Sequence, residues 1–162
     1  MAAVVRYPRV PVWVQFFNPI ARRLLAAGVP MGPNALITVA GRRSGLPRTT
    51  PVTVVESAGR WWVLAPFGEV NWVRNLRAAG RATITVRRRP EQVTAVELPL
   101  AEAVTFFRDV LAPLARRYGW LALWIVRNVD KIDIDRPVEA AQGRPVFELR
   151  RGRSTVDPEG GG

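Results

Sequence analysis

The sequence lacks both histidine and cysteine, and these two absences exclude most of the familiar catalytic and metal-binding chemistries. Without them there is no Ser-His-Asp or Cys-His nucleophile, no His/Cys zinc site, no iron–sulfur cluster and no His-ligated haem. A disulfide is equally excluded, so cysteine usage says nothing about the redox compartment. Chemistry in this chain must come from carboxylates, hydroxyls, arginines, two tyrosines or a bound cofactor.

Lysine and long apolar runs are also scarce. Lys131 is the single lysine among 24 basic residues, so the formal net charge of +11 is carried almost entirely by arginine. The longest apolar run, Trp120 to Val126, is far shorter than the roughly 20 residues that span a bilayer. Residues 1–11 hold no apolar stretch typical of a secretory signal peptide, so we expect no signal peptide. These features favour a cytoplasmic protein, with peripheral contact at the inner face of the cell membrane as the alternative.

What is present fits one domain. The chain has 162 residues, and 48% of them are hydrophobic, which is enough for a self-sufficient core. No repeat or linker divides it. We therefore expect a single domain over residues 1–150, followed by a disordered tail over residues 151–162 that ends in three glycines.

The N-terminal region carries helix signals. Asn18 and Pro19 are typical of a helix start, and Gly28 is typical of a helix end. We expect residues 11–27 to form one or two short amphipathic helices, bent near Pro19. Basic and aromatic residues there would suit an anionic membrane surface, but we favour packing against the rest of the fold.

Apolar patterns of period two alternate with turn signals along the rest of the chain. They predict strands over residues 35–40, 48–56, 60–65, 82–87, 92–98 and 146–149. Helices are predicted over residues 71–79, capped by Asn71 and ended by Gly80, over residues 101–118, kinked at Pro113, and over residues 119–129. Strands joined mostly by hairpins, with helices between and after them, favour an α+β fold built as a small antiparallel β-barrel with peripheral helices.

An arginine-rich turn from Gly41 to Pro51 (GRRSGLPRTTP) is the densest candidate site. It combines three arginines, three hydroxyls and two glycines. Glycine permits positive φ, which lets successive N–H groups converge on an anion, and arginine binds phosphate or carboxylate bidentately. The segment predicts a pocket for a polyanionic ligand, with a solvated basic hairpin turn as an equally weighted alternative.

The second candidate site runs from Ala65 to Leu76, where a strand end and a Pro/Gly loop lead into a helix start. A helix N-terminus offers unpaired N–H groups and positive dipole character. Trp72 and Asn75 share one helical face, where a planar ring could stack and be oriented by amide groups. The alternative, somewhat favoured by the residues alone, is that Trp72 and Leu76 belong to the core and Asn71 only caps the helix.

Three other features are weaker. The Asp/Ile alternation from Asp130 to Asp135 favours a strand with one polar face over a metal site, and we expect no metal. Arg87 to Arg89 favours a solvated hairpin turn. The aromatic residues of the C-terminal part are interpreted as core or lid, and as candidate substrate contacts; they are Tyr118, Trp120 and Trp124.

Two segments taken together resemble a known family. FNPIARRLLAAGVPMGPNALITVAGRRSGLPRTTPVTVV and WWVLAPFGEVNWVRNLRAAGRATITV are similar to the deazaflavin-dependent nitroreductases of actinobacteria. The pattern G-R-[KR]-[ST]-G-x-x-R-x-[TN]-P followed by W-x-x-N-L-x-A carries the likeness. It covers residues 16–98 well and the C-terminal third weakly.

The resemblance implies a split β-barrel of the flavin-reductase type that binds coenzyme F420, a deazaflavin whose tail carries a phosphate and several glutamates. It implies an oxidoreductase that transfers a hydride from C5 of the reduced deazaflavin to a quinone, a nitroaromatic or an activated enone. By the family motif, the tail would contact Arg42, Arg43, Ser44 and Arg48, and Thr49, Thr50 and Pro51 would line the tail or the ring. The ring would be flanked by Ala65, Pro66, Phe67, Trp72, Asn75 and Leu76.

Other interpretations stay open at this point. The same barrel could hold FMN, and the basic charge could belong to a polyanion- or nucleic-acid-binding module, although the arginines are scattered. The chain has Val52-Thr53-Val54 where the best-known family members have a tyrosine, so the resemblance implies the cofactor better than the substrate. We expect a small-molecule electron acceptor as partner, no nucleic acid, and a monomer or homodimer.

Overall fold

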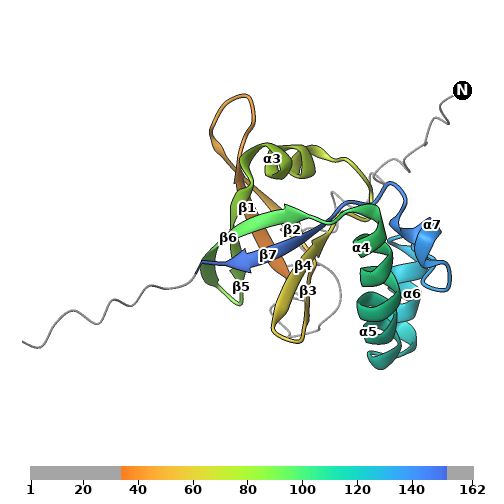
Figure 1. The fold of residues 1–162 in the computed structure, drawn as a ribbon. Helices are drawn as coiled ribbons and strands as arrows, with labels where there is room; N and C mark the ends of the chain where they lie inside the picture. The colour runs from red at the N-terminus through yellow and green to blue at the C-terminus, as the bar shows by residue number, and fades with distance from the viewer. Residues whose placement is uncertain (1–33, 153–162) are drawn as a thin grey trace, which may run out of the picture.

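The computed structural model describes residues 34–152. The helices predicted over residues 11–27 lie outside these residues, as does most of the predicted tail. Seven strands are present in the described part: β1 Ala35–Ala40, β2 Pro47–Val52, β3 Val54–Ser57, β4 Arg60–Leu64, β5 Arg81–Val86, β6 Arg89–Glu97 and β7 Val146–Arg151. They form one antiparallel sheet in the order β2-β1-β5-β6-β7-β4-β3, which curls into a half-barrel (Figure 1).

The curl follows from how β2 and β3 are connected. These two strands lie at opposite edges of the sheet, yet only Thr53 separates them in the chain. The two edges must therefore come together at Thr53. Asn34 stabilises this junction, because its side chain accepts a bond from the Val54 N–H (2.7 Å) and donates one to the Val54 carbonyl (2.8 Å).

The strand predicted over residues 48–56 is thus two strands, and that prediction was wrong. Its first half pairs with β1 and its second half with β4, so only the second half forms the predicted hairpin. Pro51 lies on β2, an edge strand, where a missing N–H can be tolerated. The other predicted strands are confirmed, with ends shifted by up to three residues.

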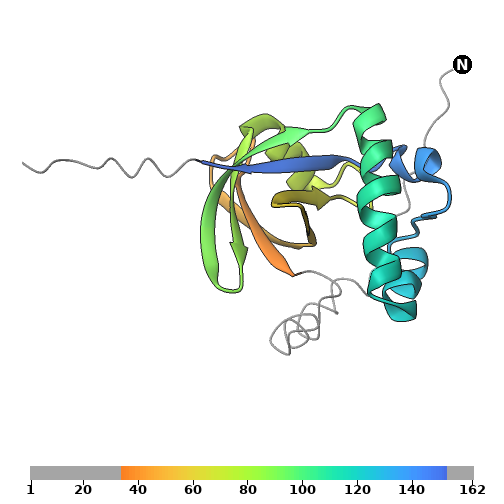
Figure 2. The same ribbon diagram turned by 60° about the horizontal axis from the view of Figure 1, so that its bottom comes forward.

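The helices gather in two places. Helix α3 (Asn71–Ala79) lies between β4 and β5 in the chain, next to the β1–β2 turn. The others stand together on the opposite side of the molecule (Figure 2): α4 Leu100–Thr105, η1 Phe106–Leu111, α5 Ala112–Arg117, α6 Trp120–Asn128 and α7 Pro137–Ala141. Within residues 34–152, no helix combines the length and the apolar character that crossing a membrane requires.

Two helix predictions need correction. Asn71 is not a cap: Val70 holds the N-cap position, and no side chain bonds to the first turn of α3. Gly80 ends α3 as predicted, with φ at 67°. The kink predicted at Pro113 appears as the π-helical segment η1 just before it, where the Ala112 N–H bonds to Phe107. Proline lacks the N–H that an α-helical ladder needs, and a π-segment accommodates that defect.

The sheet separates two hydrophobic cores. Val63 and its neighbours fill the barrel, whereas Trp62 and Phe106 belong to a second core between the sheet and helices α4–α7. The segment from Asp130 to Asp135 is not a strand, contrary to the prediction. It is an irregular loop whose Ile132 and Ile134 are buried in the second core. The alternation of Asp and Ile therefore reflects which side chains are buried, although the segment does not pair with a strand.

Candidate functional site

The arginine-rich segment forms a tight turn between β1 and β2, over residues 41–46. The Gly41 N–H donates to the Leu46 carbonyl and the Gly45 N–H to the Gly41 carbonyl, both at 2.8 Å. Gly45 has φ at 69°, the left-handed conformation that favours glycine. Gly41 is needed for space, because a Cβ there would lie 2.9 Å from the Ser44 hydroxyl.

Most backbone N–H groups of this turn already have acceptors, so they contribute less to anion binding than the glycines suggest. Four of its six N–H groups already donate within the protein: those of Gly41, Arg42, Gly45 and Leu46. The turn therefore offers a ligand mainly its side chains, together with the N–H groups of Arg43 and Ser44. Arg43, Ser44 and Arg48 are exposed, and neither arginine forms an ion pair with any described residue.

The two candidate segments meet through Arg42 and Asn75. The Asn75 Oδ1 atom accepts bonds from the Arg42 backbone N–H (3.2 Å) and from Arg42 Nη1 (2.9 Å). Asn75 is 7% exposed and is the single buried polar residue among residues 34–152. Figure 1 shows the turn beside α3, as this contact requires. The structure thus joins two segments that are 33 residues apart in the chain.

The hydroxyl residues of β2 continue the basic surface. Thr49 shares a 2.8 Å hydrogen bond with Thr38 on β1, and Thr50 and Pro51 are half-buried further along the strand. No acidic residue occurs between Gly41 and Val55. The turn and the start of β2 consequently carry three arginine charges and no acidic residue of their own.

The second candidate segment combines core residues with half-buried aromatics. Ala65 and Leu76 are 0% and 1% exposed, so their side chains belong to the barrel core. Pro66 and Phe67 are half-buried, and the half-buried Trp72 ring lies 6.4 Å from that of Phe147 in a tilted arrangement. The absence of a side-chain cap on α3 leaves the first-turn N–H groups of this helix available.

Arg144, which the sequence did not single out, holds the start of this loop in place. Its guanidinium donates to the carbonyls of Pro66 (3.2 Å), Ala140 (3.1 Å) and Lys131 (2.7 Å). Burial lowers the pKa of Arg144 and raises the pKa of neighbouring Asp130 to about 6, an effect that the positive charge of Arg144 opposes. No sequence signal predicts this arrangement, because the carbonyls of Pro66 and Lys131 belong to residues far from Arg144 in the chain.

Two cavities of the described part lie away from the predicted cofactor contacts. One of about 200 Å³ is bordered by Glu69, Arg77, Glu97 and Arg144. Arg77 bonds through two nitrogens to Glu97 and through a third to Glu69, and these hydrogen bonds raise its pKa. None of the predicted cofactor contacts lines this cavity or a second one beside Lys131.

The predicted substrate contacts do not join the site. Tyr118, Trp120 and Trp124 are 50%, 78% and 52% exposed, at the end of α5 and on α6. In both ribbon views α6 lies across the molecule from the turn over residues 41–46. These aromatics are therefore separate from the arginine turn.

A curled antiparallel sheet with helices at one side defines the split β-barrel class. Residues 19–130 match the model of the F420H(2)-dependent quinone reductase family, and the chain belongs to this family. It is therefore an F420-dependent reductase, and the predictions of the fold, the enzyme class and coenzyme F420 as cofactor are confirmed. No protein with a curated function matches the chain.

Solved structures with similar folds have low sequence identity. A protein described as a 5-nitroimidazole antibiotic resistance protein from Bacteroides thetaiotaomicron is 10% identical, with a TM-score of 0.51 over 82% of this chain and 80% of that chain. The F420-H2 dependent reductase FDR-A is 21% identical, with a TM-score of 0.45 over 73% and 94%. A structure described as a domain-swapped dimer is 20% identical, with a TM-score of 0.44 over 85% and 98%. The oligomeric state of this chain stays a prediction.

Proposed function

We propose that this protein binds the anionic tail of reduced F420 on the arginine turn and the deazaflavin ring beside α3, and that it reduces a quinone. The observation that carries the proposal is the double hydrogen bond from Arg42 to Asn75. It joins the segment proposed to bind the tail to the segment proposed to bind the ring, as a long ligand with an anionic end and a planar end requires.

The side chains of the turn suit a phosphate and several carboxylates. Arg43 and Arg48 are exposed cations without an acidic partner in the described part, and arginine pairs with both anion types bidentately. The Ser44 hydroxyl accepts a bond from the Leu46 N–H at 3.3 Å and can still donate its own proton. Tail binding therefore rests on side chains, with Thr49 and Thr50 next along β2.

The ring-binding part uses half-buried surfaces. Trp72, Pro66 and Phe67 offer apolar area next to the uncapped start of α3, while Ala65 and Leu76 support them from the core. Arg144 fixes the Pro66 carbonyl and thereby the path of the loop. This part of the chain binds and orients the ring and excludes water from one of its faces.

When bound, the reduced cofactor supplies the hydride, because no amino-acid side chain donates one. A quinone that accepts this hydride also takes up one proton to become the hydroquinone, and solvent or a side chain supplies that proton. The protein would bind and orient the cofactor and the acceptor and shape the electrostatic field around them. A quinone is the acceptor we favour, since the family is defined by quinone reduction. Nitroaromatics and activated enones are the alternative acceptors.

Ligand titration tests the cofactor site. The purified protein is titrated with coenzyme F420, with the same deazaflavin lacking the phosphate and glutamates, and with FMN, at two salt concentrations. We expect F420 to bind at least about tenfold more tightly than the tail-less compound, with the difference shrinking at high salt. Equal affinity for both deazaflavins would remove the arginine turn from the site.

Steady-state kinetics test the acceptor. Oxidation of reduced F420 is followed with a quinone, a nitroaromatic and an activated enone at matched concentrations, and we expect the highest kcat/KM with the quinone. Turnover of another acceptor alone would overturn the quinone assignment while leaving the cofactor site intact.

A further inference from the structure

Helix α6 is apolar on both of its sides. On its inner side, half-buried Leu123 and Val126 pack against the second core, and Ala122 is buried. Its outer side carries Trp120 and Trp124, one helical turn apart, with Leu121 beside them. A helix that is hydrophobic all round is normally covered on all sides, yet Trp120 is 78% exposed.

Exposed apolar side chains concentrate at this one place. Eight large hydrophobic residues are exposed in the described part, and four of them fall within residues 118–124. We call Tyr118, Trp120, Leu121 and Trp124 the aromatic face. Isolated exposed hydrophobics are ordinary, whereas a contiguous group of this kind marks a surface that contacts something apolar.

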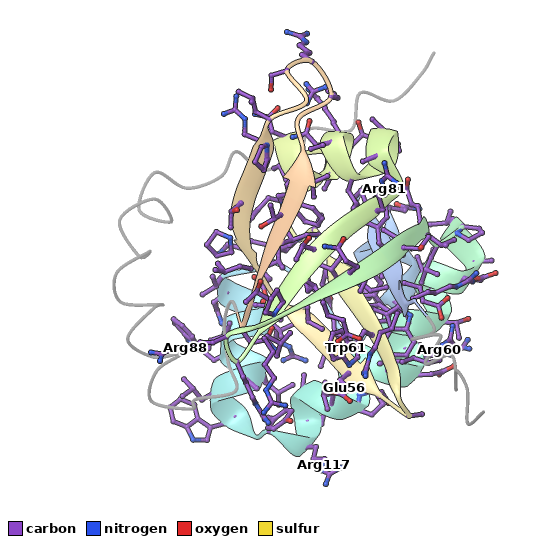
Figure 3. The ribbon with its side chains drawn as sticks, turned by 90° about the vertical axis from the view of Figure 1, so that its left-hand side faces the viewer. Glu56, Arg60, Trp61, Arg81, Arg88 and Arg117 are labelled. Atoms are coloured by element: carbon purple, nitrogen blue, oxygen red, sulfur yellow. The ribbon has the colours of Figure 1, made fainter. Side chains whose placement is uncertain are left out.

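Positive charge surrounds the aromatic face. Arg116 and Arg117 directly precede it, Arg127 follows it, and no acidic residue occurs from Ala112 to Val129. Arg116 and Arg127 both pair with Asp135, which neutralises only one of them. Arg117 forms no ion pair with a described residue and extends from the end of the helices (Figure 3).

A second basic element lies on the same side of the molecule as the aromatic face. The tip of the β5–β6 hairpin carries Arg87, Arg88 and Arg89, all exposed. In both ribbon views this tip and the end of α5 extend to the same side of the molecule. The protein thus presents two groups of arginines toward one side, with tryptophans at one of them.

We propose that the aromatic face docks the protein on the surface of an anionic lipid bilayer. Tryptophan and tyrosine favour the boundary between headgroups and hydrocarbon. Arginines beside them are attracted to anionic lipids, which strengthens binding. Membrane docking does not require the proposed function. It depends on that function only for its biological use, which is to give the enzyme access to a quinone dissolved in the bilayer. It also gives Tyr118, Trp120 and Trp124 a role other than direct substrate contact.

Vesicle flotation of the full chain tests the proposal, without cofactor or acceptor. Binding is compared for pure phosphatidylcholine vesicles and for vesicles containing phosphatidylglycerol. We expect binding to the anionic vesicles, weakened by salt, and reduced at least about tenfold by Trp120→Ser with Trp124→Ser, since on the order of 100 Å² of apolar surface is lost. Arg117→Gln should reduce it about fivefold on anionic vesicles alone.

Matched variants decide where the contact lies. Val138→Ser removes an apolar residue on α7 that is as exposed as Trp124, and it should leave binding unchanged. Absence of vesicle binding, or a loss with Trp13→Ser and none with the Trp120/Trp124 pair, would overturn the proposal. Self-association without vesicles that the same pair abolishes would also overturn it, since a second copy would then cover the face. Because F420 affinity is measured separately in solution, failure here leaves the reductase proposal standing.

Discussion

The Oδ1 atom of Asn75, buried in α3, accepts two hydrogen bonds from Arg42, one from its backbone and one from its guanidinium. A single buried amide oxygen therefore sets both the position of the turn and the direction of one of its arginines. The relationship makes Asn75 a positioning residue for the anion-binding surface, in addition to any contact with the ring.

Replacing Asn75 with alanine should lower the free energy of unfolding by about 1–3 kcal/mol, because two donors of Arg42 lose their acceptor. The turn also loses its anchor, so affinity for F420 should fall. Chemical denaturation and cofactor titration measure the two effects.

Two further variants separate these effects. Asn75→Asp keeps the acceptor and adds a negative charge beside Arg42, so it should preserve stability but still weaken binding of the anionic tail. Asn71→Ala, at the exposed first residue of α3, should change neither. A fully stable Asn75→Ala protein with normal affinity would show that the bond to Arg42 has no positioning role.

Replacing Arg48 with alanine should weaken F420 binding by about 1.5–3 kcal/mol, the value of a charge-assisted hydrogen bond to the tail. The tail-less deazaflavin should bind the variant as well as it binds the unaltered protein. Arg89→Ala, which removes the same charge from the β5–β6 hairpin, is the matched control. An equal loss in both variants would indicate a general effect of net charge rather than a contact by Arg48.

Much of the fold follows from local patterns in the sequence. Alternating apolar residues located β1, and Gly80 marked the end of α3, because these signals depend on neighbouring residues alone. The split between β2 and β3 could not be found this way. Residues 48–56 are rich in β-branched side chains on both sides of Pro51. Only the closure of the sheet, with Asn34 at the junction, decides that Thr53 leaves the ladder.

The candidate site was predictable in its residue types and less so in its geometry. The arginines of the turn are exposed as expected, but four of the six backbone N–H groups already donate, three within the turn and one to Asn75, which only the hydrogen bonds reveal. Arg144 had no sequence signal, since an arginine that binds carbonyl oxygens needs no acidic partner nearby in the chain.

Asp130 gives the protein a stability that decreases as the pH rises. Burial lifts its pKa from 3.8 to about 6 in the folded state, despite the nearby charge of Arg144. The folded state thus binds more protons than the unfolded state between these values, so the stabilisation present below pH 4 is lost as the pH rises through 6. The free energy of unfolding that is lost in this way amounts to up to about 3 kcal/mol.

Asp130→Asn should abolish this pH dependence. The variant has no carboxylate to ionise, so at pH 8 it should be more stable than the unaltered protein by about 1–3 kcal/mol, with little difference at pH 3.5. Urea unfolding at a series of pH values measures both. A variant that is less stable at pH 8 would show that the charge attraction to Arg144 outweighs the cost of burying the carboxylate.

The turn of the β5–β6 hairpin has a strained backbone conformation, and replacing a turn residue with glycine should relieve that strain. Its two turn residues, Arg87 and Arg88, have φ at 48° and 64°, a conformation that costs a side chain about 1 kcal/mol or more. The β3–β4 turn has the same geometry but holds Gly59 at the second position. Arg88→Gly should therefore raise the free energy of unfolding by about 0.5–1 kcal/mol, whereas Gly59→Ala should lower it by a similar amount.

The same Arg88→Gly protein should bind anionic vesicles more weakly, because it loses one positive charge at the hairpin tip. Unchanged stability in both variants would indicate that neither turn is strained, and vesicle binding then measures the charge alone.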